Sequence, residues 1–411
     1  MASIADVIQY GVNGVALGSV IALAAIGLTL IYGILNLANF AHGDLLAVGA
    51  YGAFFFSVSV PPVEAAFWAL GLAVVLAAVG VAGLLAPPTR GRSAGSWRAG
   101  LLEPSEARAA VVGAAALAAA VLGLSLPARG LALPALAGAL ALGAAALVVA
   151  RRRTARGRGS DVAWALGGGG TALAAWALAS PFFLAAALGA AAAVVVAVLF
   201  EAVVWRPLRA RRATILTLLI VSIGVAFIVR NAIAIRFGSD FLNYARPLEL
   251  PWRVGPAIFT VDQATTLVVA AAAIAGVHAF LAFTRTGKAL RALADNPDLA
   301  RLSGMDVNRL VVALWILAAG LAGLAGALLP LNNFAVSPGV GFTLLLTLFA
   351  AVILGGIGSA YGAMAGGLVI GVVMELVAGL ASPDYKFAAS FAVLILVLLV
   401  RPQGILGGRA T

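Results

Sequence analysis

The sequence predicts an all-α protein, built as a polytopic bundle of transmembrane helices. Of its 411 residues, 63% are hydrophobic and only 10% are charged, whereas an ordinary globular domain has about 45–50% apolar residues. The mean hydropathy is +1.11. Apolar runs of roughly 20 residues, enough to cross a hydrocarbon core of about 30 Å, recur along the whole chain. One transmembrane domain, 1–411, embedded in lipid is therefore expected rather than several soluble domains.

The apolar runs are interrupted by Pro, Gly and charged residues, and they define about thirteen candidate spans. Some of these spans could be broken or re-entrant helices. They lie near 4–33, 42–60, 63–86, 106–126, 131–150, 161–179, 181–205, 213–235, 263–283, 307–330, 341–357, 360–380 and 386–400.

The basic residues predict the orientation of these spans, because short cytoplasmic loops retain Lys and Arg. With the N-terminus outside and the C-terminus inside, 20 of the 26 basic residues fall in inner loops. The formal net charge of +11 is then mostly topogenic, with some contact to anionic lipid. Nucleic acid is not an expected partner. The inner loops are 87–108, 151–160, 206–212, 284–309 and 401–411.

Several chemistries are excluded by residues that the chain lacks. It has no Cys, which excludes disulfides, thiolate metal sites and thiol nucleophiles. The motif GxxxxGK[ST] is absent, and GGGG at 167–170 is not followed by Lys, so any ATP must be bound by another chain. His42 and His278 are the only histidines, and no ligand set accompanies them. We expect no metal, no cofactor bound by this chain and no catalytic residues.

A short helix is expected within the polar segment 284–310. Asp295 or Asn296 can cap it, Pro297 suits its first position, and Gly304 suits the residue after its end. About two turns of helix are unstable alone in water, so the helix must pack on something. It could rest on the inner surface of the protein or on lipid headgroups, or it could dock to a cytosolic partner. The contact would come from apolar residues at helical spacing: Leu299, Leu302 and Met305.

Polar residues crowd the stretch NLANFAHGD, 36–44, between two apolar runs. On the predicted topology it is the inner connection between the first two spans. Asp44 can favour the N-terminus of the second span by capping and through the helix dipole, and the Asn side chains can satisfy freed backbone groups. The alternative is that Asn39, His42 and Asp44 belong to a gate or pathway.

Glycines cluster in LGGIGSAYGAMAGGLVIG, 354–371, with GxxxG at 362–366 and 367–371. Small residues of this kind allow helix backbones to approach closely within a membrane. Gly355, Gly356 and Gly358 also divide two short apolar runs, as in a discontinuous helix beside a transport pathway. Both interpretations remain open from the sequence.

Five blocks of the chain carry a family resemblance: GVNGVALGSVIALAAIGLTLIYGILNLANFAHGDLLAVGAYGA at 11–53, followed by 201–231, 287–310, 350–376 and 385–407. In this order they resemble the permease subunits of bacterial and archaeal ABC importers for branched-chain amino acids. The resemblance implies a multi-pass protein of the cytoplasmic membrane that moves small amino acids by alternating access. It also implies cytosolic ATP-binding subunits, a second permease subunit and an extracytoplasmic solute-binding protein as partners. The loop matching 287–310 is the ATPase-coupling segment in that family.

The chain departs from the family pattern between 62 and 180. The family usually crosses this interval with about one span, whereas four additional candidate spans lie here. An even number of added spans preserves the orientation of everything downstream, so we interpret 62–180 as an accessory insertion.

Substrate contacts are predicted at three polar residues. Glu375 lies within a span, where a carboxylate usually faces a cavity or a partner. It could attract the ammonium of an amino acid, pair with Arg230 or lie close to the outer surface. Asn332 and Asn333 follow a span at its outer end, where they could meet the substrate carboxylate or simply terminate the helix. A permease for urea or amides, or an ion-coupled secondary transporter, remains an alternative.

Overall fold

The computed structural model describes residues 3–58, 181–242, 244, 250–332, 335–401 and 403–406. Within this part, seven helices are long and apolar enough to cross a membrane, which confirms the helical membrane class. Four predicted spans and the whole of the predicted insertion 62–180 lie outside the described residues. The full span count and the orientation therefore stay predictions. The chain divides into two compact units, 1–58 with 186–411 and 59–185, and the first of them forms the helical bundle.

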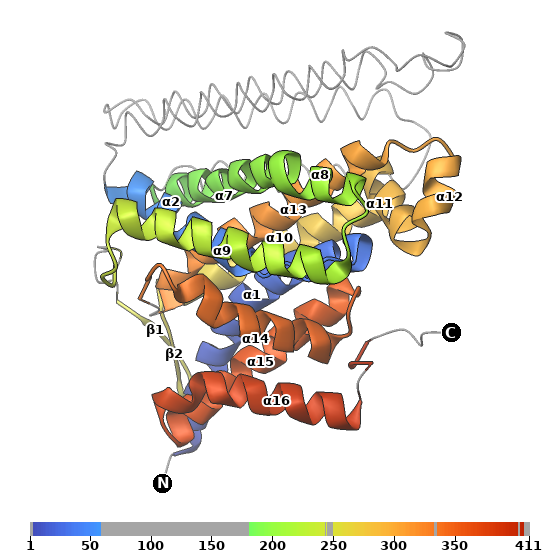
Figure 1. Ribbon diagram of the computed structural model, residues 1–411. Coiled ribbons are helices and arrows are strands. Elements are labelled where there is room, and N and C mark those ends of the chain that lie inside the picture. The colour runs from blue at the N-terminus through green and yellow to red at the C-terminus, as the bar shows by residue number, and fades with distance from the viewer. Residues whose placement is uncertain are drawn as a thin grey trace, which may run out of the picture. The chain divides into compact units, whose positions relative to one another are not determined.

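The described helices follow the predicted spans closely (Figure 1). They are α1 (Ile4–Leu35), α2 (His42–Val58), α7 (Pro181–Phe200), a π-helix (Glu201–Trp205), α8 (Arg206–Ala210), α9 (Ile215–Phe237), α10 (Val261–Phe283), α11 (Arg285–Asp295), α12 (Pro297–Leu302), α13 (Val307–Leu328), α14 (Val340–Gly355), α15 (Ala360–Leu380) and α16 (Lys386–Val400). A hairpin of β1 (Trp252–Val254) and β2 (Ala257–Phe259) lies at the end of the bundle opposite α11 and α12.

Helix α1 is the centre of the bundle. In its most apolar window, 94% of the residues are buried, against 11–33% for the windows of α9, α10, α15 and α16. Its neighbours are α10, α13, α14 and, above all, α15. A Cβ placed on Gly371 of α15 would lie 2.2 Å from Cα of Gly18 in α1. The GxxxG stripe of α15 therefore brings two backbones together, as the packing interpretation predicts.

The Gly355–Gly358 break is a turn and not an interruption in one continuous helix. Gly356 and Gly358 have positive φ values of 102° and 86°. The two flanking helices, α14 and α15, fold back on each other, because a Cβ on Gly366 would meet the carbonyl oxygen of Ala351 at 2.0 Å. The discontinuous-helix interpretation was therefore wrong. The backbone N–H of Gly358 donates to Thr29 Oγ1 at 2.9 Å, which ties the turn to α1.

Residues 403–406 return to the end of α14. The N–H of Ile405 donates to the carbonyl of Leu354 at 2.7 Å, and the N–H of Leu406 donates to that of Gly355 at 3.0 Å. The last carbonyls of a helix have no partner within it. The C-terminal segment thus caps α14 from about fifty residues downstream in the sequence.

Candidate functional site: the junction of α2 and α14

The NLANFAHGD stretch runs back into the bundle instead of lying at its surface. His42 Nε2 donates to the carbonyl of Ala24 at 2.9 Å, and Ala24 lies eleven residues, or about 16 Å, before the end of α1 at Leu35. Asn39, His42 and Asp44 are all at most 1% exposed. The expectation that this stretch is the inner connection between two spans was therefore incomplete. The connection re-enters the bundle and α2 begins within it.

The contacts of this stretch with helix α9 show how deep it lies in the bundle. The N–H of Phe40 donates to Ser222 Oγ at 3.2 Å, and Arg230 reaches Asp44. Ser222 and Arg230 each lie seven residues, about 10 Å, from the nearer end of α9. The start of α2 therefore lies at the middle depth of a helix long enough to cross the membrane.

Helix α14 begins at the same place as α2. A Cβ on Gly43 would lie 2.1 Å from the carbonyl oxygen of Gly341, and a Cβ on Gly341 would lie 2.2 Å from that of Gly43. Only glycine at both positions allows this approach. We call the meeting point of the two helix starts, residues 39–44 and 340–342, the junction. The positive dipole ends of two helices thus meet inside the bundle.

One ion pair lies at the junction. Asp44, in the first turn of α2, is paired with Arg230 through Nε to Oδ1 at 3.3 Å and Nη2 to Oδ2 at 3.4 Å. Asp44 lies in the first turn of the second span, and its role in stabilising the start of that helix stays a prediction. Its side chain is 0% exposed and that of Arg230 is 20% exposed. The guanidinium lies 4.7 Å from the ring centroid of Phe342 and 5.4 Å from that of Phe227.

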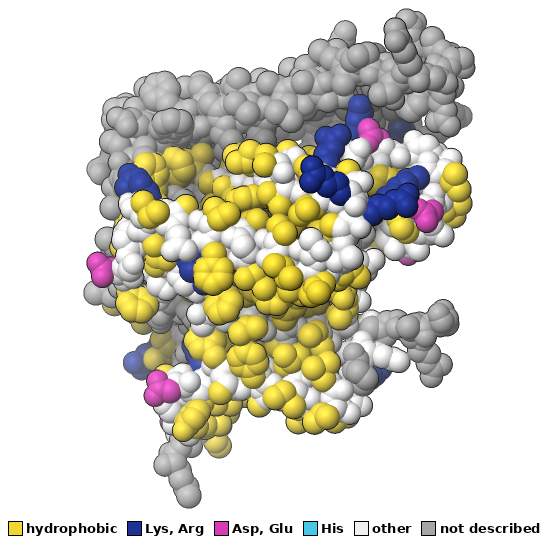
Figure 2. All heavy atoms as spheres, in the orientation of Figure 1, with side chains coloured by type: hydrophobic (Ala, Val, Ile, Leu, Met, Phe, Trp, Pro, Cys, Tyr) yellow, Lys and Arg dark blue, Asp and Glu magenta, His cyan; other side chains and the backbone are white. Residues whose placement is uncertain are grey.

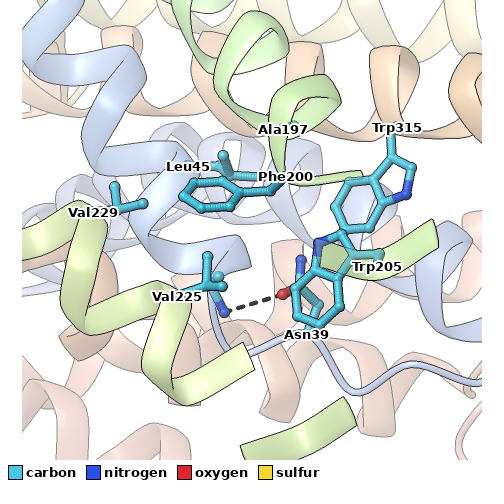
Figure 3. A pocket seen from close by; sticks show the side chains of 9 residues that line it. Asn39, Leu45, Ala197, Phe200, Trp205, Val225, Val229 and Trp315 are labelled. Carbon is cyan, nitrogen blue, oxygen red and sulfur yellow. Dashed lines mark hydrogen bonds between the residues drawn. The ribbon is translucent and has the colours of Figure 1, made fainter. Parts of the chain in front are cut away.

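A small cavity lies beside the junction, with room for about one water molecule. Figure 3 shows Asn39 next to Trp205, with Trp315 of α13 beyond it and Val225 of α9 on the near side. Asn39 Oδ1 accepts the N–H of Ala41 at 3.2 Å. Asn39 Nδ2 and Trp315 Nε1 are buried and have no hydrogen-bond partner among the described residues. The two indoles stack with centroids 6.2 Å apart.

Glu375 has a different partner from the one that the sequence suggested. It pairs with Lys386, the first residue of α16, and Arg230 pairs with Asp44. The Glu375–Arg230 alternative was therefore wrong. Glu375 lies five residues before the end of α15 at Leu380, on the side predicted to be outside. Its pairing is away from the junction.

Asn332 closes the 3-10 helix Leu329–Asn332 that follows α13, and it does not reach the junction. Its Nδ2 donates to the carbonyl of Leu328 at 3.2 Å and to Thr266 Oγ1 at 3.4 Å. This is the helix-terminating geometry. Asn333 lies outside the described residues.

The polar segment 284–310 forms two helices, where one was predicted. Amphipathic α11 packs on α10 and α13 and buries Leu290 and Leu293. Asn296, not Asp295, caps α12, accepting the N–H groups of Asp298 and Leu299 at 3.1 and 2.9 Å. Pro297 is the first helical residue, and Gly304 has a positive φ of 80°, both as predicted.

The two leucines of α12 point away from the protein. Leu299 is 60% exposed and Leu302 is 84% exposed, and Met305 is only half-buried. These leucines therefore do not anchor α12 to the inner surface of its own chain. Figure 2 shows Lys and Arg side chains gathered near α8 and α11, at the same end of the bundle.

Tyr244, in the segment that follows α9, connects this segment to α2. Its hydroxyl donates to the carbonyl of Ala50 at 2.7 Å. Burial raises the pKa of Tyr244 above its usual range, so the hydroxyl keeps the proton that this bond needs.

No group of three or more metal-binding side chains occurs among the residues that the structure describes. The second histidine, His278 of α10, is hydrogen-bonded to the hydroxyl of Tyr361, far along the chain from His42.

Sequence reasoning missed the importance of Arg230 and of the second re-entrant start. The available signal for Arg230 was its place as a basic residue within a predicted span. A signal for α14 was an internal similarity: ILNLANFA, 34–41, resembles LLPLNNFA, 328–335, and each stretch follows a long helix and precedes a start at the junction.

The bundle and its long apolar helices define a multi-pass helical membrane protein. The family model described as "Branched-chain amino acid transport system / permease component" matches residues 10–90 and 96–398. The chain belongs to this family of ABC-transporter permeases and is a multi-pass protein of the cytoplasmic membrane. The matched ranges include most of residues 62–180. That this segment is an accessory insertion stays a prediction.

Curated relatives agree with the family match. The chain is 28% identical over 405 residues to the high-affinity branched-chain amino acid transport system permease protein LivH of Salmonella typhimurium, covering 97% of this chain and 95% of the relative. It is 27% identical over 415 residues to BraD of Pseudomonas aeruginosa, covering 99% and 98%. It is 37% identical over 139 residues to a probable LivH of Methanocaldococcus jannaschii, covering 32% and 44%. No solved structure matches the chain.

Proposed function

We propose that this chain is a membrane-spanning subunit of an ATP-driven importer for branched-chain or related small amino acids. It moves the solute by alternating access, while separate cytosolic subunits hydrolyse ATP and an extracytoplasmic protein delivers the solute. A second permease subunit completes the passage, and this chain binds no cofactor. The family match supports the transport role, and the names of the relatives support the substrate class.

The exposed leucines of α12 carry the proposal that energy comes from another chain. A six-residue helix is too short to be stable alone, and this one presents Leu299 and Leu302 outward at the basic end of the bundle. A cleft in a cytosolic ATPase would cover both leucines. The chain has no phosphate-binding motif of its own.

An ion-coupled mechanism is less well supported by the carboxylates. Proton- or ion-coupled transporters place ionisable groups along the pathway where they change partners. Three carboxylates within the described bundle are each paired with a basic residue: Asp44 with Arg230, Glu201 with Arg209, and Glu375 with Lys386.

Uptake in proteoliposomes tests the proposal. The complete complex, loaded with ATP inside the vesicles and supplied with leucine-loaded binding protein, should accumulate leucine. Omitting the ATPase subunits should abolish accumulation, and neither a proton nor a sodium gradient should replace ATP. Accumulation driven by an ion gradient alone would refute the ABC mechanism, and ATP-driven uptake of urea but not leucine would change the substrate.

A further inference from the structure

The Asp44–Arg230 ion pair is longer than usual, as expected for a pair in which another charged group can replace one partner. Its two N···O distances of 3.3 and 3.4 Å exceed the roughly 2.7–2.9 Å usual for a charged N–H donor and a carboxylate. Asp44 is fully buried and Arg230 is partly exposed. The guanidinium therefore approaches Asp44 from the open side of the junction.

That open side places the cation of Arg230 at a surface otherwise made of apolar side chains. Arg230 is flanked by Phe227 of α9 and Phe342 of α14, which are 55% and 44% exposed. Figure 2 shows hydrophobic side chains over α9, α14 and α16 on this face. A cation at mid-membrane depth is costly against hydrocarbon, so such a group usually faces a pathway or a partner. An apolar wall around one guanidinium also suits a small solute with an apolar side chain.

The junction supplies attraction for a carboxylate beyond Arg230. The starts of α2 and α14 both lie there, and the positive ends of helices favour anions. A donor without a partner lies in the same place: Asn39 Nδ2 is buried in a side chain 1% exposed and has no hydrogen-bond partner among the described residues.

We propose that the Asp44–Arg230 pair recognises the zwitterion of an α-amino acid, an inference that rests on the transport role proposed above. The substrate ammonium replaces the guanidinium at Asp44. Arg230, turned toward the α9–α14 face, takes the substrate carboxylate together with the two helix starts. The exchange keeps every charge paired, whereas an amine or an acid alone would leave Asp44 or Arg230 without a partner at a cost.

The competing role for the pair is a structural link between α9 and α2. The two roles predict different selectivity for the charged groups of the ligand. Leucine and two analogues, each lacking one of these groups, measure that selectivity. 3-Methylbutylamine lacks the carboxylate of leucine, and 4-methylpentanoate lacks its ammonium. Binding of radiolabelled leucine to the complete complex in nanodiscs, without the solute-binding protein, is measured by scintillation proximity with each analogue as competitor.

For the wild type, we expect both analogues to bind at least about tenfold more weakly than leucine, because each forfeits one charged contact. Arg230→Gln should weaken leucine binding by about 10- to 100-fold, to the affinity that the wild type has for 3-methylbutylamine. Asp44→Asn should weaken leucine binding to the affinity that the wild type has for 4-methylpentanoate. The matched control is Arg236→Gln, an exposed arginine of α9 stacked on Phe55 and Phe237, and it should leave leucine binding unchanged.

A structural link predicts different results. The double variant Asp44→Asn with Arg230→Gln would recover leucine binding, because no charge is left unpaired, whereas the proposed site stays weak. Recovery in the double variant, unchanged selectivity in assembled single variants, or no leucine binding by the wild type would overturn the inference. None of these results would contradict ATP-driven uptake by the wild type, and the uptake experiment tests the proposed function separately.

Charge-retaining variants cover the case in which neutral variants fail to assemble. Arg230→Lys and Asp44→Glu keep the ion pair but shift the charged atoms and, for Lys, remove the planar fork. Both should weaken leucine binding while the complex still assembles. Wild-type affinity in both would overturn the proposal.

Discussion

Two regions of the chain each contain an Asp–Arg ion pair, and the pairs differ in every respect except their chemistry. At the junction, Asp44 is 0% exposed and its arginine comes from another helix. In α12, Asp298 and Arg301 are 84% and 62% exposed and lie one turn apart in the same helix. The junction satisfies its charges within the chain, whereas α12 leaves charges and leucines uncovered. Substitutions at the junction should therefore affect the folded subunit, and substitutions in α12 should affect only what binds it.

The largest effect is expected from removing the buried carboxylate. Asp44→Ala leaves Arg230 inside the bundle without its anion, at a cost of about 3–5 kcal/mol in the free energy of unfolding. Asp298→Ala is the matched control, and its cost should stay within about 0.5 kcal/mol. Denaturant or thermal unfolding of the purified subunit measures both. Equal stability of the two variants would contradict the contrast between the regions.

The second effect concerns coupling and leaves stability unchanged. Replacing Leu299 and Leu302 together by Asp should lower ATP-driven uptake at least about tenfold, because apolar anchors dominate docking contacts. The unfolding temperature should not move, since both side chains are exposed. The control is Leu299→Ile with Leu302→Met, which keeps the apolar contact and should keep uptake. Normal coupling in the double Asp variant would refute docking through α12.

The third prediction concerns the close approach of α2 and α14. Gly43→Ala places a Cβ 2.1 Å from the carbonyl oxygen of Gly341, and the overpacking should cost about 1–3 kcal/mol. Gly224→Ala in α9 is the control, because nothing lies within 4 Å of a Cβ there. Unfolding and uptake are measured for both variants. If both variants unfold at the wild-type temperature, the two helix starts are not held together as described.

The smallest effect is expected at Glu375. Its pair with Lys386 lies near a helix end and away from the junction, so leucine uptake by Glu375→Gln should stay within about twofold of the wild type. Uptake by vesicles at matched protein content measures this. A loss as large as that of Asp44→Asn would place the carboxylate that recognises the substrate at Glu375.

The sequence predicted most of the helices of the described region because apolar length is a local property. The predicted spans 263–283, 341–357 and 360–380 differ from α10, α14 and α15 by at most two residues at either end. The caps at Asn296 and Gly304 were equally local, since each depends on one residue type at one backbone conformation. Helix α11 was missed because its apolar residues are too few to resemble a span.

The arrangement of the site was less predictable because it depends on contacts distant in sequence. Asp44 and Arg230 are 186 residues apart, so no local spacing links them. The sequence suggested Arg230 as a partner of Glu375, and only the three-dimensional structure shows Lys386 in that place. The depth of NLANFAHGD was hidden for the same reason. A hydropathy pattern records that a connection is polar, but not whether it turns at the surface or returns into the bundle.

The bonds from Ile405 and Leu406 to the end of α14 have a practical consequence for preparing the protein. A truncation before Gly404 would strip the partners from two helix carbonyls, and a purification tag placed close behind Leu406 would crowd them. Helix α14 is 16 residues, or about 24 Å, long, and its other end is the start that meets Gly43. Tags are therefore better placed at the N-terminus, where α1 begins with its own Ser3–Asp6 capping box.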